Sequence, residues 1–169
     1  MIMKKLFLSV CLLVLVLSGC GKAEDEEFKA TDILSEEEVA EFIDYKPVVE
    51  ERRTRLLKSV KYKNPEIGKS DIVEVLVYPE NQKMTRDDIK AQFEEQKKRN
   101  IEYDNLIDVE GIDADVFIAI PSVHIYKNGY YAVISAGSGG AEKQIDLLER
   151  IAEVAVQNID ELTENEEQK

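Results

Sequence analysis

The stretch VHIYKNGYYAVISA, residues 123–136, carries the strongest local fold signal in this chain of 169 residues. The pair Asn128-Gly129 separates two runs that are rich in β-branched and aromatic residues. Both residues of the pair tolerate the positive φ of a type I′ turn, and a two-residue loop of this kind pairs Lys127 with Tyr130. The sequence therefore predicts an antiparallel β-hairpin with a defined register.

This register assigns each side chain of the hairpin to one of two faces, because successive residues of a strand point in opposite directions. The apolar face, predicted to pack on the core, consists of Val123, Ile125, Ala132 and Ile134. The opposite face carries hydroxyl groups, two tyrosines and the only histidine of the chain, at Ser122, His124, Tyr126, Tyr131, Val133 and Ser135. Tyrosine offers a large contact area at low entropic cost, so this face is a candidate partner-binding surface. The candidate residues are His124, Tyr126, Tyr131 and Ser135. Alternatively, the tyrosines only stabilise a solvent-facing sheet as a cross-strand pair.

Around the hairpin, further helix and strand signals predict one α+β domain. Helices are expected at about 36–44, after the capping box at Ser35, from Thr85 to about Arg99, and at about 141–161. Strands are expected at 56–62, 72–78, 105–109 and 114–120. The last helix has the widest apolar stripe and is predicted to be the main one packed on the sheet. This order predicts an antiparallel sheet of about five to six strands, with about three helices packed mainly on one face.

One region runs against the acidic charge of the chain, whose formal net charge is −13. Residues 52–69 contain seven positive residues, and Glu66 is the one negative residue among them. If residues 53–63 form a continuous strand, four cations share one face and make a candidate anion-binding site: Arg53, Arg55, Lys61 and Lys63. Alternatively, these are ordinary exposed cations that neighbouring carboxylates such as Glu50 and Glu51 neutralise.

The first twenty residues carry a targeting signal. Lys4 and Lys5 precede an apolar run over residues 6–17, and Leu17-Ser18-Gly19-Cys20 follows it. This order resembles the signal peptide and lipobox of bacterial lipoproteins. The resemblance implies cleavage before Cys20, acylation of Cys20, and attachment to the extracytoplasmic face of the bacterial cell membrane through this N-terminal lipid. The alternative is a short transmembrane anchor, but the run would extend only about 18 Å as a helix, against roughly 30 Å of hydrocarbon.

These signals divide the chain into four parts. Residues 1–19 are the signal peptide, and residues 20–30 are a lipidated, flexible, acidic tether that contains Glu24-Asp25-Glu26-Glu27. Residues 31–162 form the single α+β domain, and residues 163–169 form a frayed acidic tail. The acidic charge repels phosphate backbones, so no nucleic-acid partner is expected.

The domain also bears a general resemblance to known folds. Its element order from about Ile33 to Ile159, the helix opening Leu34-Ser35-Glu36-Glu37 and the bend Gly111-Ile112-Asp113-Ala114 are similar to those of small α+β lipoproteins of unknown function from Gram-positive bacteria. More distantly, the order is similar to the PsbP-like sandwich. This resemblance implies an antiparallel sheet with flanking helices, and it implies no catalytic residues.

Motifs for catalysis and for cofactor binding are missing from the sequence. The glycines at 137–140 lack the dinucleotide-binding spacing, because the third glycine position is Glu142. One histidine without cysteine ligands does not make a common zinc site. We therefore expect no metal and no cofactor. The sequence predicts a non-catalytic binding module of the cell envelope whose partner is an envelope protein or polymer. The alternatives are a carrier that holds a small apolar ligand between sheet and helices and, third, an envelope hydrolase.

Overall fold

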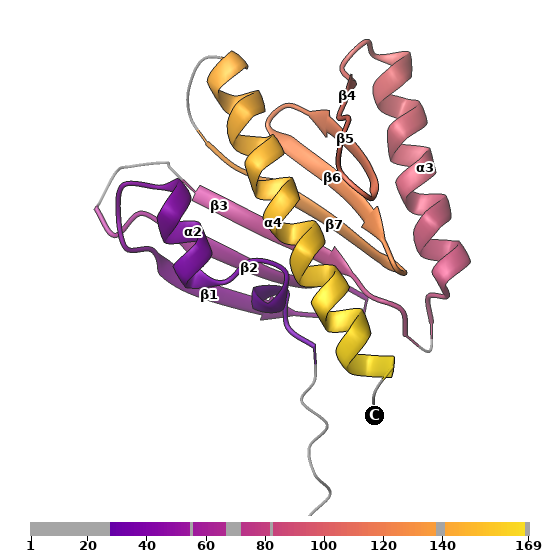
Figure 1. Cartoon of the computed structure of the whole chain (residues 1–169), viewed down its shortest axis with the longest axis horizontal. Coiled ribbons are helices and arrows are strands. Elements are labelled where there is room, and N and C mark those ends of the chain that lie inside the picture. Colours follow the sequence, from indigo (N-terminus) through magenta and orange to yellow (C-terminus); the bar gives the residue numbers. More distant parts are fainter. Residues whose placement is uncertain (1–27, 55, 67–71, 82, 138–140, 168–169) are drawn as a thin grey trace, which may run out of the picture.

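A computed structural model gives the structure of the chain and describes residues 28–54, 56–66, 72–81, 83–137 and 141–167. Its centre is a seven-stranded antiparallel sheet with the strand order β1-β2-β3-β7-β6-β5-β4 (Figure 1). The strands are β1 Val48–Arg53, β2 Lys58–Lys63, β3 Ile72–Tyr78, β4 Ile107–Asp108, β5 Asp115–Ala119, β6 Ser122–Lys127 and β7 Tyr130–Ser135. The helices are η1 Ala30–Asp32, α2 Glu36–Phe42, α3 Arg86–Glu102 and α4 Ala141–Glu167. The predicted α+β class is confirmed, with slightly more strands than expected.

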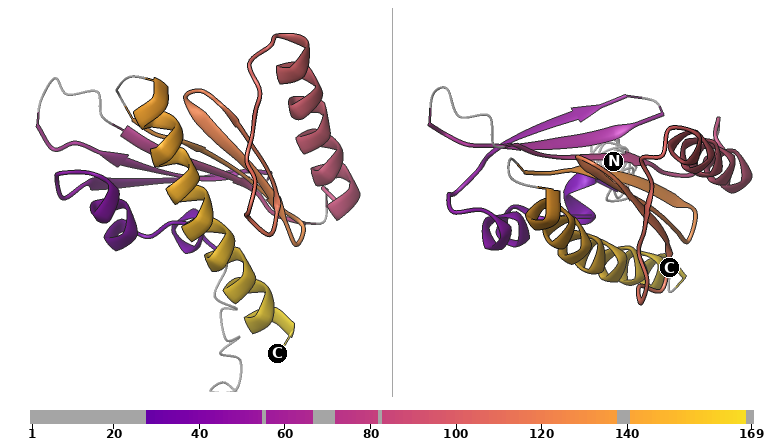
Figure 2. Two further views of the ribbon diagram at one scale, coloured as in Figure 1. Left: turned by 45° about the horizontal axis from the view of Figure 1, so that its top comes forward. Right: turned by 90° about the horizontal axis from the view of Figure 1, so that it is seen from above.

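The helices cover both faces of the sheet (Figure 2). The long helix α4 contacts β5, β6 and β7 on one face, which we call the α4 face, and η1 and α2 lie on the same side. Helix α3 packs on β6 and β7 from the other side, which we call the α3 face. The prediction that the helices pack mainly on one face therefore holds for α2, α4 and η1, whereas α3 covers part of the opposite face.

The hairpin register predicted from Asn128-Gly129 is confirmed. Lys127 pairs with Tyr130, and the two turn residues have φ values of 51° and 89°. The apolar residues of the hairpin, Val123, Ile125, Ala132 and Ile134, are 0% exposed. They belong to the main core together with Leu148 and Ile151 of α4. The alternation of side chains between the two faces along two paired strands therefore predicts correctly which hairpin residues lie in the main core.

A second, smaller core lies beneath α3. Ile89 and Phe93 of this helix pack with Phe117 of β5 and Tyr131 of β7, and Tyr131 is 3% exposed. The prediction that Tyr131 belongs to an open sheet face is therefore wrong. The cause is tertiary, because a helix outside the hairpin supplies the apolar groups that bury this tyrosine.

The region of positive charge is a hairpin and not the continuous strand expected over residues 53–63. Its turn follows Thr54, whose hydroxyl group donates to the carbonyl of Leu57 at 3.0 Å and accepts from the Leu57 amide at 3.0 Å. Arg53 pairs with Lys58, so it lies on the α4 face, whereas Lys61 and Lys63 lie on the α3 face. Strand β1 was not predicted, and Arg55 lies outside the described residues.

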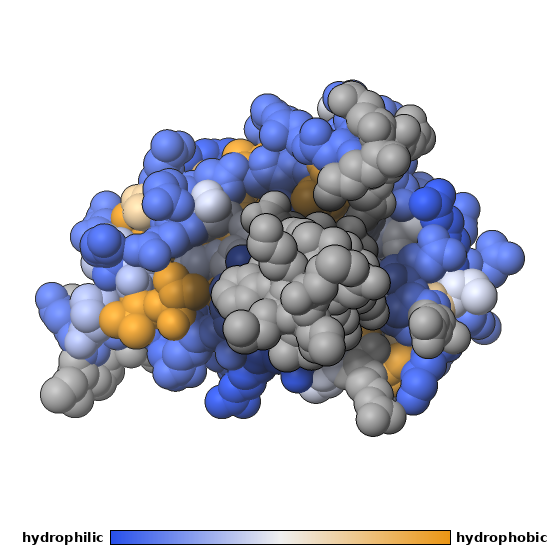
Figure 3. Space-filling view, turned by 90° about the horizontal axis from the view of Figure 1, so that it is seen from below, coloured by the Kyte–Doolittle hydropathy of each residue, from blue (hydrophilic) through white to orange (hydrophobic). Residues whose placement is uncertain are grey.

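Both ends of the domain extend beyond the predicted boundaries. Phe28 packs against the main core and Ala30 is 4% exposed, so residues 28–30 belong to the domain and not to the tether. Helix α4 continues to Glu167, so the expected frayed tail is helical over residues 163–167. Cys20 lies outside the described residues. Within the described part of the chain, no helix is both long and apolar enough to span a membrane. Seen from below the view of Figure 1, the coloured surface is mostly hydrophilic and carries small apolar areas (Figure 3).

Candidate functional site

A groove with a volume of about 410 Å³ borders α3 on the α3 face of the sheet. We call it the α3 groove. Its lining residues come from β3, α3, β6 and β7, and they are Tyr78, Gln92, Glu95, Gln96, His124, Tyr131 and Val133. The groove lies at the edge of α3 because this helix covers β6 and β7 and has no comparable contact with β1 and β2. The groove therefore joins a part of the sheet that α3 covers to a part that none of the described helices covers on this face.

His124 forms part of the groove and is fixed by its neighbours. Its ring stacks on Phe117, with 4.4 Å between the ring centroids and 7° between the planes. Its Nδ1 atom lies 2.8 Å from the hydroxyl oxygen of Tyr131, within hydrogen-bond distance. Burial lowers the pKa of His124 to about 4. The imidazole is therefore neutral at pH 7, and it offers hydrogen bonding without charge.

Tyr131 supports His124 from the neighbouring strand. Its ring stacks on Tyr78 at 5.5 Å and meets Phe93 edge-on at 5.6 Å. Burial, and to a smaller extent the nearby Tyr78, raises the pKa of the Tyr131 hydroxyl above its ordinary value. The phenol therefore keeps its proton at physiological pH. The floor of the groove is an aromatic cluster with neutral hydrogen-bonding groups.

Helix α3 supplies the polar wall of the groove, with Gln92, Glu95 and Gln96. Each glutamine amide can both donate and accept hydrogen bonds. Glu95 is exposed, and its Oε1 atom lies 2.9 Å from the guanidinium group of Arg99. Among the described lining residues, the groove thus contains one carboxylate, held by an arginine, beside two uncharged amides.

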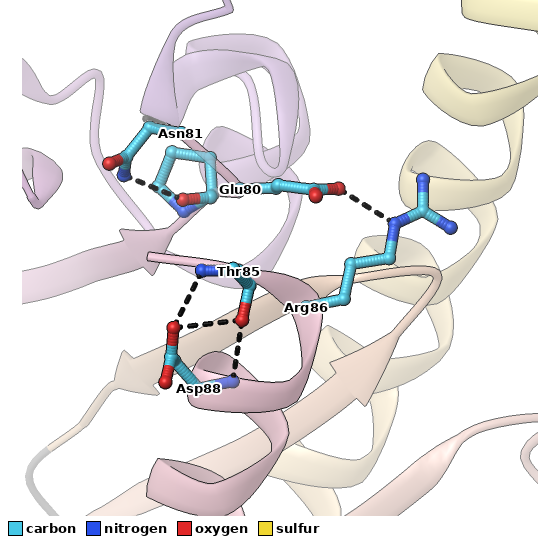
Figure 4. A network of polar contacts seen from close by, with 6 residues as sticks. Glu80, Asn81, Thr85, Arg86 and Asp88 are labelled. Atoms are coloured by element: carbon cyan, nitrogen blue, oxygen red, sulfur yellow. Dashed lines mark hydrogen bonds and ion pairs between the residues drawn. The ribbon is translucent and has the colours of Figure 1, made fainter. Parts of the chain in front are cut away.

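The start of α3 is fixed by a capping box (Figure 4). The Thr85 hydroxyl accepts from the amide of Asp88, and the Asp88 carboxylate accepts from the Thr85 amide at 2.9 Å. The hydrogen bonds that the Asp88 carboxylate accepts from the amide and the hydroxyl group of Thr85 lower the pKa of this carboxyl group. One residue further on, the Arg86 Nε atom lies 2.8 Å from Glu80 of the preceding loop. The cap and the ion pair together fix the start of α3, the helix that supplies Gln92, Glu95 and Gln96 to the groove.

Only two of the four predicted hairpin residues line this groove, namely His124 and Tyr131. Tyr126 is half-buried on the same face, and it packs against Phe93 with the Lys90 ammonium group 5.6 Å from its ring centroid. The hydroxyl group of Ser135 lies 2.7 Å from that of Ser122. Tyr126 and Ser135 therefore share the face of the sheet but are not lining residues of the groove.

Sequence reasoning missed the residues that the rest of the fold brings to the groove. These are Tyr78, Gln92, Glu95 and Gln96. Tyr78 ends a strand that was predicted correctly, but its proximity to Tyr131 depends on the pairing of β3 with β7. That pairing joins strands far apart in the sequence, and no local pattern specifies it.

The three described cations of the predicted anion site, Arg53, Lys61 and Lys63, do not form one cluster. Lys61 lies 3.0 Å from Glu74, and Lys63 lies 2.6 Å from Glu50. The hydrogen bond from Lys63 is the main cause that lowers the pKa of the Glu50 carboxyl group. Arg53, on the other face, lies 3.2 Å from Glu51. Neighbouring carboxylates thus pair with these cations, as the alternative interpretation expects.

No family model, curated protein or solved structure matches this chain. The resemblances to bacterial lipoproteins and to the PsbP-like sandwich therefore stay predictions. Among the described residues, no group of three or more histidine, cysteine, aspartate or glutamate side chains is arranged to hold a metal ion. The groove is accordingly interpreted from its own side chains.

Proposed function

We propose that this protein is an extracytoplasmic lipoprotein, attached to the cell membrane through Cys20, that acts as a non-catalytic binding module of the cell envelope. We further propose that its partner binds at the α3 groove. The observation that supports this site is the groove itself, in which the fixed pair His124 and Tyr131 faces the glutamine wall of α3. The anchor is supported by the sequence Leu17-Ser18-Gly19-Cys20 alone.

The side chains of the groove favour an uncharged partner group. His124 is neutral and Tyr131 protonated at pH 7, and Gln92 and Gln96 provide uncharged donors and acceptors. The carboxylate of Glu95 in the described lining disfavours anions, as does the net charge of −13. The proposed ligand therefore presents hydrogen-bonding groups to α3 and an apolar surface to the ring of Tyr78.

The two alternative functions have less support. A carrier of an apolar ligand needs a cavity lined by Val, Ile and Phe, whereas polar side chains contribute to the α3 groove. A hydrolase would be favoured by a buried carboxylate beside His124. The carboxylate of the groove is that of Glu95, which is exposed and paired with Arg99.

A photo-crosslinking experiment on intact cells tests the proposed site. A photoreactive amino acid replaces Gln92 in the groove or, as a matched control, Gln157, which is exposed on α4 at the opposite face. We expect the variant at position 92 to form one dominant adduct with an envelope component and the control to form none. Equal adducts from both positions, or none from either, would refute the α3 groove as the site.

The anchor is tested separately. The substitution Cys20→Ser should abolish labelling by radioactive palmitate and leave uncleaved precursor or released protein. A wild-type chain found entirely in the culture medium, without acyl mass on its N-terminus, would rule out membrane attachment. It would leave the partner site at the groove open to its own test.

A further inference from the structure

The wall that α3 contributes to the α3 groove contains hydrogen-bonding groups that the described fold does not use. Gln92, Glu95 and Gln96 follow one another at intervals of three and one residues, so Gln92 is three and four positions from the other two and shares one face of α3 with them. The side-chain amides of Gln92 and Gln96 make no hydrogen bond to any described residue. Each amide has two donor hydrogens and one acceptor oxygen. A ligand in the groove therefore meets planar, uncharged groups that can both donate and accept.

Tyr78 of β3 provides an apolar surface in the same groove. Its side chain is half-buried, and the ring of Tyr131 stacks on it with 5.5 Å between the centroids and 20° between the planes. Tyr131 is the one aromatic partner of Tyr78 among the described residues, so this stacking uses one of the two faces of the Tyr78 ring. The groove thus combines a polar wall from the helix with an aromatic surface from the sheet.

The position of the groove within the sheet argues against a peptide as its ligand. An extended peptide is bound by adding a strand at a sheet edge, where backbone groups are unpaired. The strands that line the groove, β3, β7 and β6, are interior strands with a paired neighbour on each side. A helical peptide needs an apolar groove, whereas Gln92, Glu95 and Gln96 are polar. The groove therefore fits neither common mode of peptide recognition.

A neutral saccharide has the two kinds of surface that the groove requires. A pyranose ring presents C–H groups on its faces and hydroxyl groups around its rim. One C–H face can pack on the Tyr78 ring, while rim hydroxyl groups exchange hydrogen bonds with the glutamine amides and donate to the Glu95 carboxylate. The volume of about 410 Å³ lies within the range of small-ligand pockets. Building on the proposed function of the α3 groove, we propose that its ligand is an uncharged saccharide unit of an envelope glycan.

Calorimetric titration of the purified full chain tests this proposal. The neutral probes are the β-1,4-linked tetrasaccharides of N-acetylglucosamine, glucose and mannose, and the anionic comparison is tetragalacturonate. We expect saturable binding of at least one neutral probe at about 1 mM or below. Tetragalacturonate should bind at least tenfold more weakly than that probe, because the Glu95 carboxylate and the net charge of −13 repel it.

Substitutions in the groove connect this binding to the residues that carry the proposal. Tyr78→Ala should weaken binding at least tenfold, and Tyr78→Phe, which keeps the ring, should restore most of the lost affinity. The double variant Gln92→Ala, Gln96→Ala should also weaken binding at least tenfold, and its positions are exposed and half-buried, so the fold is retained. The matched control is Gln157→Ala on the exposed side of α4, which should leave the affinity unchanged.

The outcomes distinguish this inference from the proposed function on which it rests. The saccharide is refuted if none of the neutral probes binds at about 10 mM, or if the groove variants bind them as tightly as the wild type does. Tighter binding of tetragalacturonate than of every neutral probe would also refute an uncharged ligand. A dominant photo-adduct between position 92 and an envelope protein, without saccharide binding, would refute the saccharide and retain the α3 groove as the partner site.

Discussion

The Nδ1 atom of His124 lies 2.8 Å from the hydroxyl oxygen of Tyr131, although the two residues are not directly opposite each other in the sheet. His124 pairs with Val133, and Tyr131 pairs with Tyr126, so the hydrogen bond is a diagonal contact between β6 and β7. Long side chains on one face of a sheet can bridge this diagonal distance. The two-residue turn at Asn128-Gly129 fixes the register, and the register brings imidazole and phenol together.

The burial of His124 makes the stability of the protein depend on pH. Burial lowers the pKa of His124 to about 4 in the folded protein, against about 6.5 when it is exposed. Between these values the unfolded chain takes up a proton that the folded protein does not. The stability that neutral His124 contributes is therefore complete above about pH 6.5 and is lost as the pH falls to about 4. We expect a loss of about 3 kcal/mol over this range, measured by urea denaturation at a series of pH values.

The control for this prediction is His124→Gln. Glutamine keeps hydrogen-bonding capacity and does not titrate, so the variant should be less stable at pH 7 but nearly independent of pH between 6.5 and 4.5. The hydrogen-bonded carboxyl group of Glu38 has a lowered pKa, so its own contribution is lost only at more acidic pH. A wild-type profile as flat as that of the variant would contradict a half-buried His124 that stays neutral in the folded protein.

Two substitutions of Tyr131 should distinguish the contribution of its ring to stability from the contribution of its hydroxyl group. Tyr131→Ala should cost about 3–5 kcal/mol of unfolding free energy, because it removes a ring that is 3% exposed and leaves a cavity beside Phe93. Tyr131→Phe should cost only about 0.5–1.5 kcal/mol, since it removes the hydrogen bond to His124 alone. The half-buried Tyr126 is the comparison, and Tyr126→Ala should cost less than Tyr131→Ala in the same denaturation experiment.

The difference between these tyrosines shows where prediction from the sequence ends. Alternation and one turn signal are sufficient to predict the register of β6 and β7, because both are local properties. The two tyrosines have the same residue type and the same face, yet Tyr131 is buried and Tyr126 is half-buried. What distinguishes them is how α3 lies on the sheet, and Ile89 and Phe93 give this helix only a narrow apolar stripe.

The positive region between residues 52 and 63 shows the same limit for charges. A continuous strand and a hairpin give similar counts of cations, but they distribute them differently over the two faces. The turn depends on hydrogen bonds of Thr54, a residue that is also common in strands. The structure therefore separates Arg53 from Lys61 and places it with Lys58 and Arg86 in the lining of a cavity of about 770 Å³, and this grouping needs both the β1–β2 hairpin and the start of α3.

The contact between α4 and the sheet should dominate the stability of the domain. Leu148 and Ile151 are both 0% exposed in the main core. Leu148→Ala or Ile151→Ala should each cost about 2–5 kcal/mol through lost burial and the cavity left behind. Glu153→Ala on the exposed side of the same helix should change stability by about 0.5 kcal/mol or less. Chemical denaturation monitored by circular dichroism measures all three, and similar losses at positions 148 and 153 would contradict the assigned core face.

The hairpin turn allows backbone strain to be measured apart from side-chain contact. Gly129 and Gly111 have nearly equal φ values, +89° and +85°. A Cβ atom on Gly129 would lie 3.0 Å from the Arg86 side chain, whereas a Cβ atom on Gly111 would have no atom within 4 Å. Gly111→Ala should therefore cost about 1 kcal/mol from the left-handed backbone alone.

Gly129→Ala should cost roughly 1 kcal/mol more than Gly111→Ala, because Arg86 has to move as well. In an Arg86→Ala background this excess should disappear, and a double-mutant cycle on unfolding free energies measures it as the coupling between the two positions. If Gly129→Ala lowers the unfolding free energy equally with and without the Arg86 side chain, Arg86 does not pack against the β6–β7 turn as it does in the structure. A preserved coupling would instead demonstrate that the start of α3 and the turn of the central hairpin meet through this one side chain.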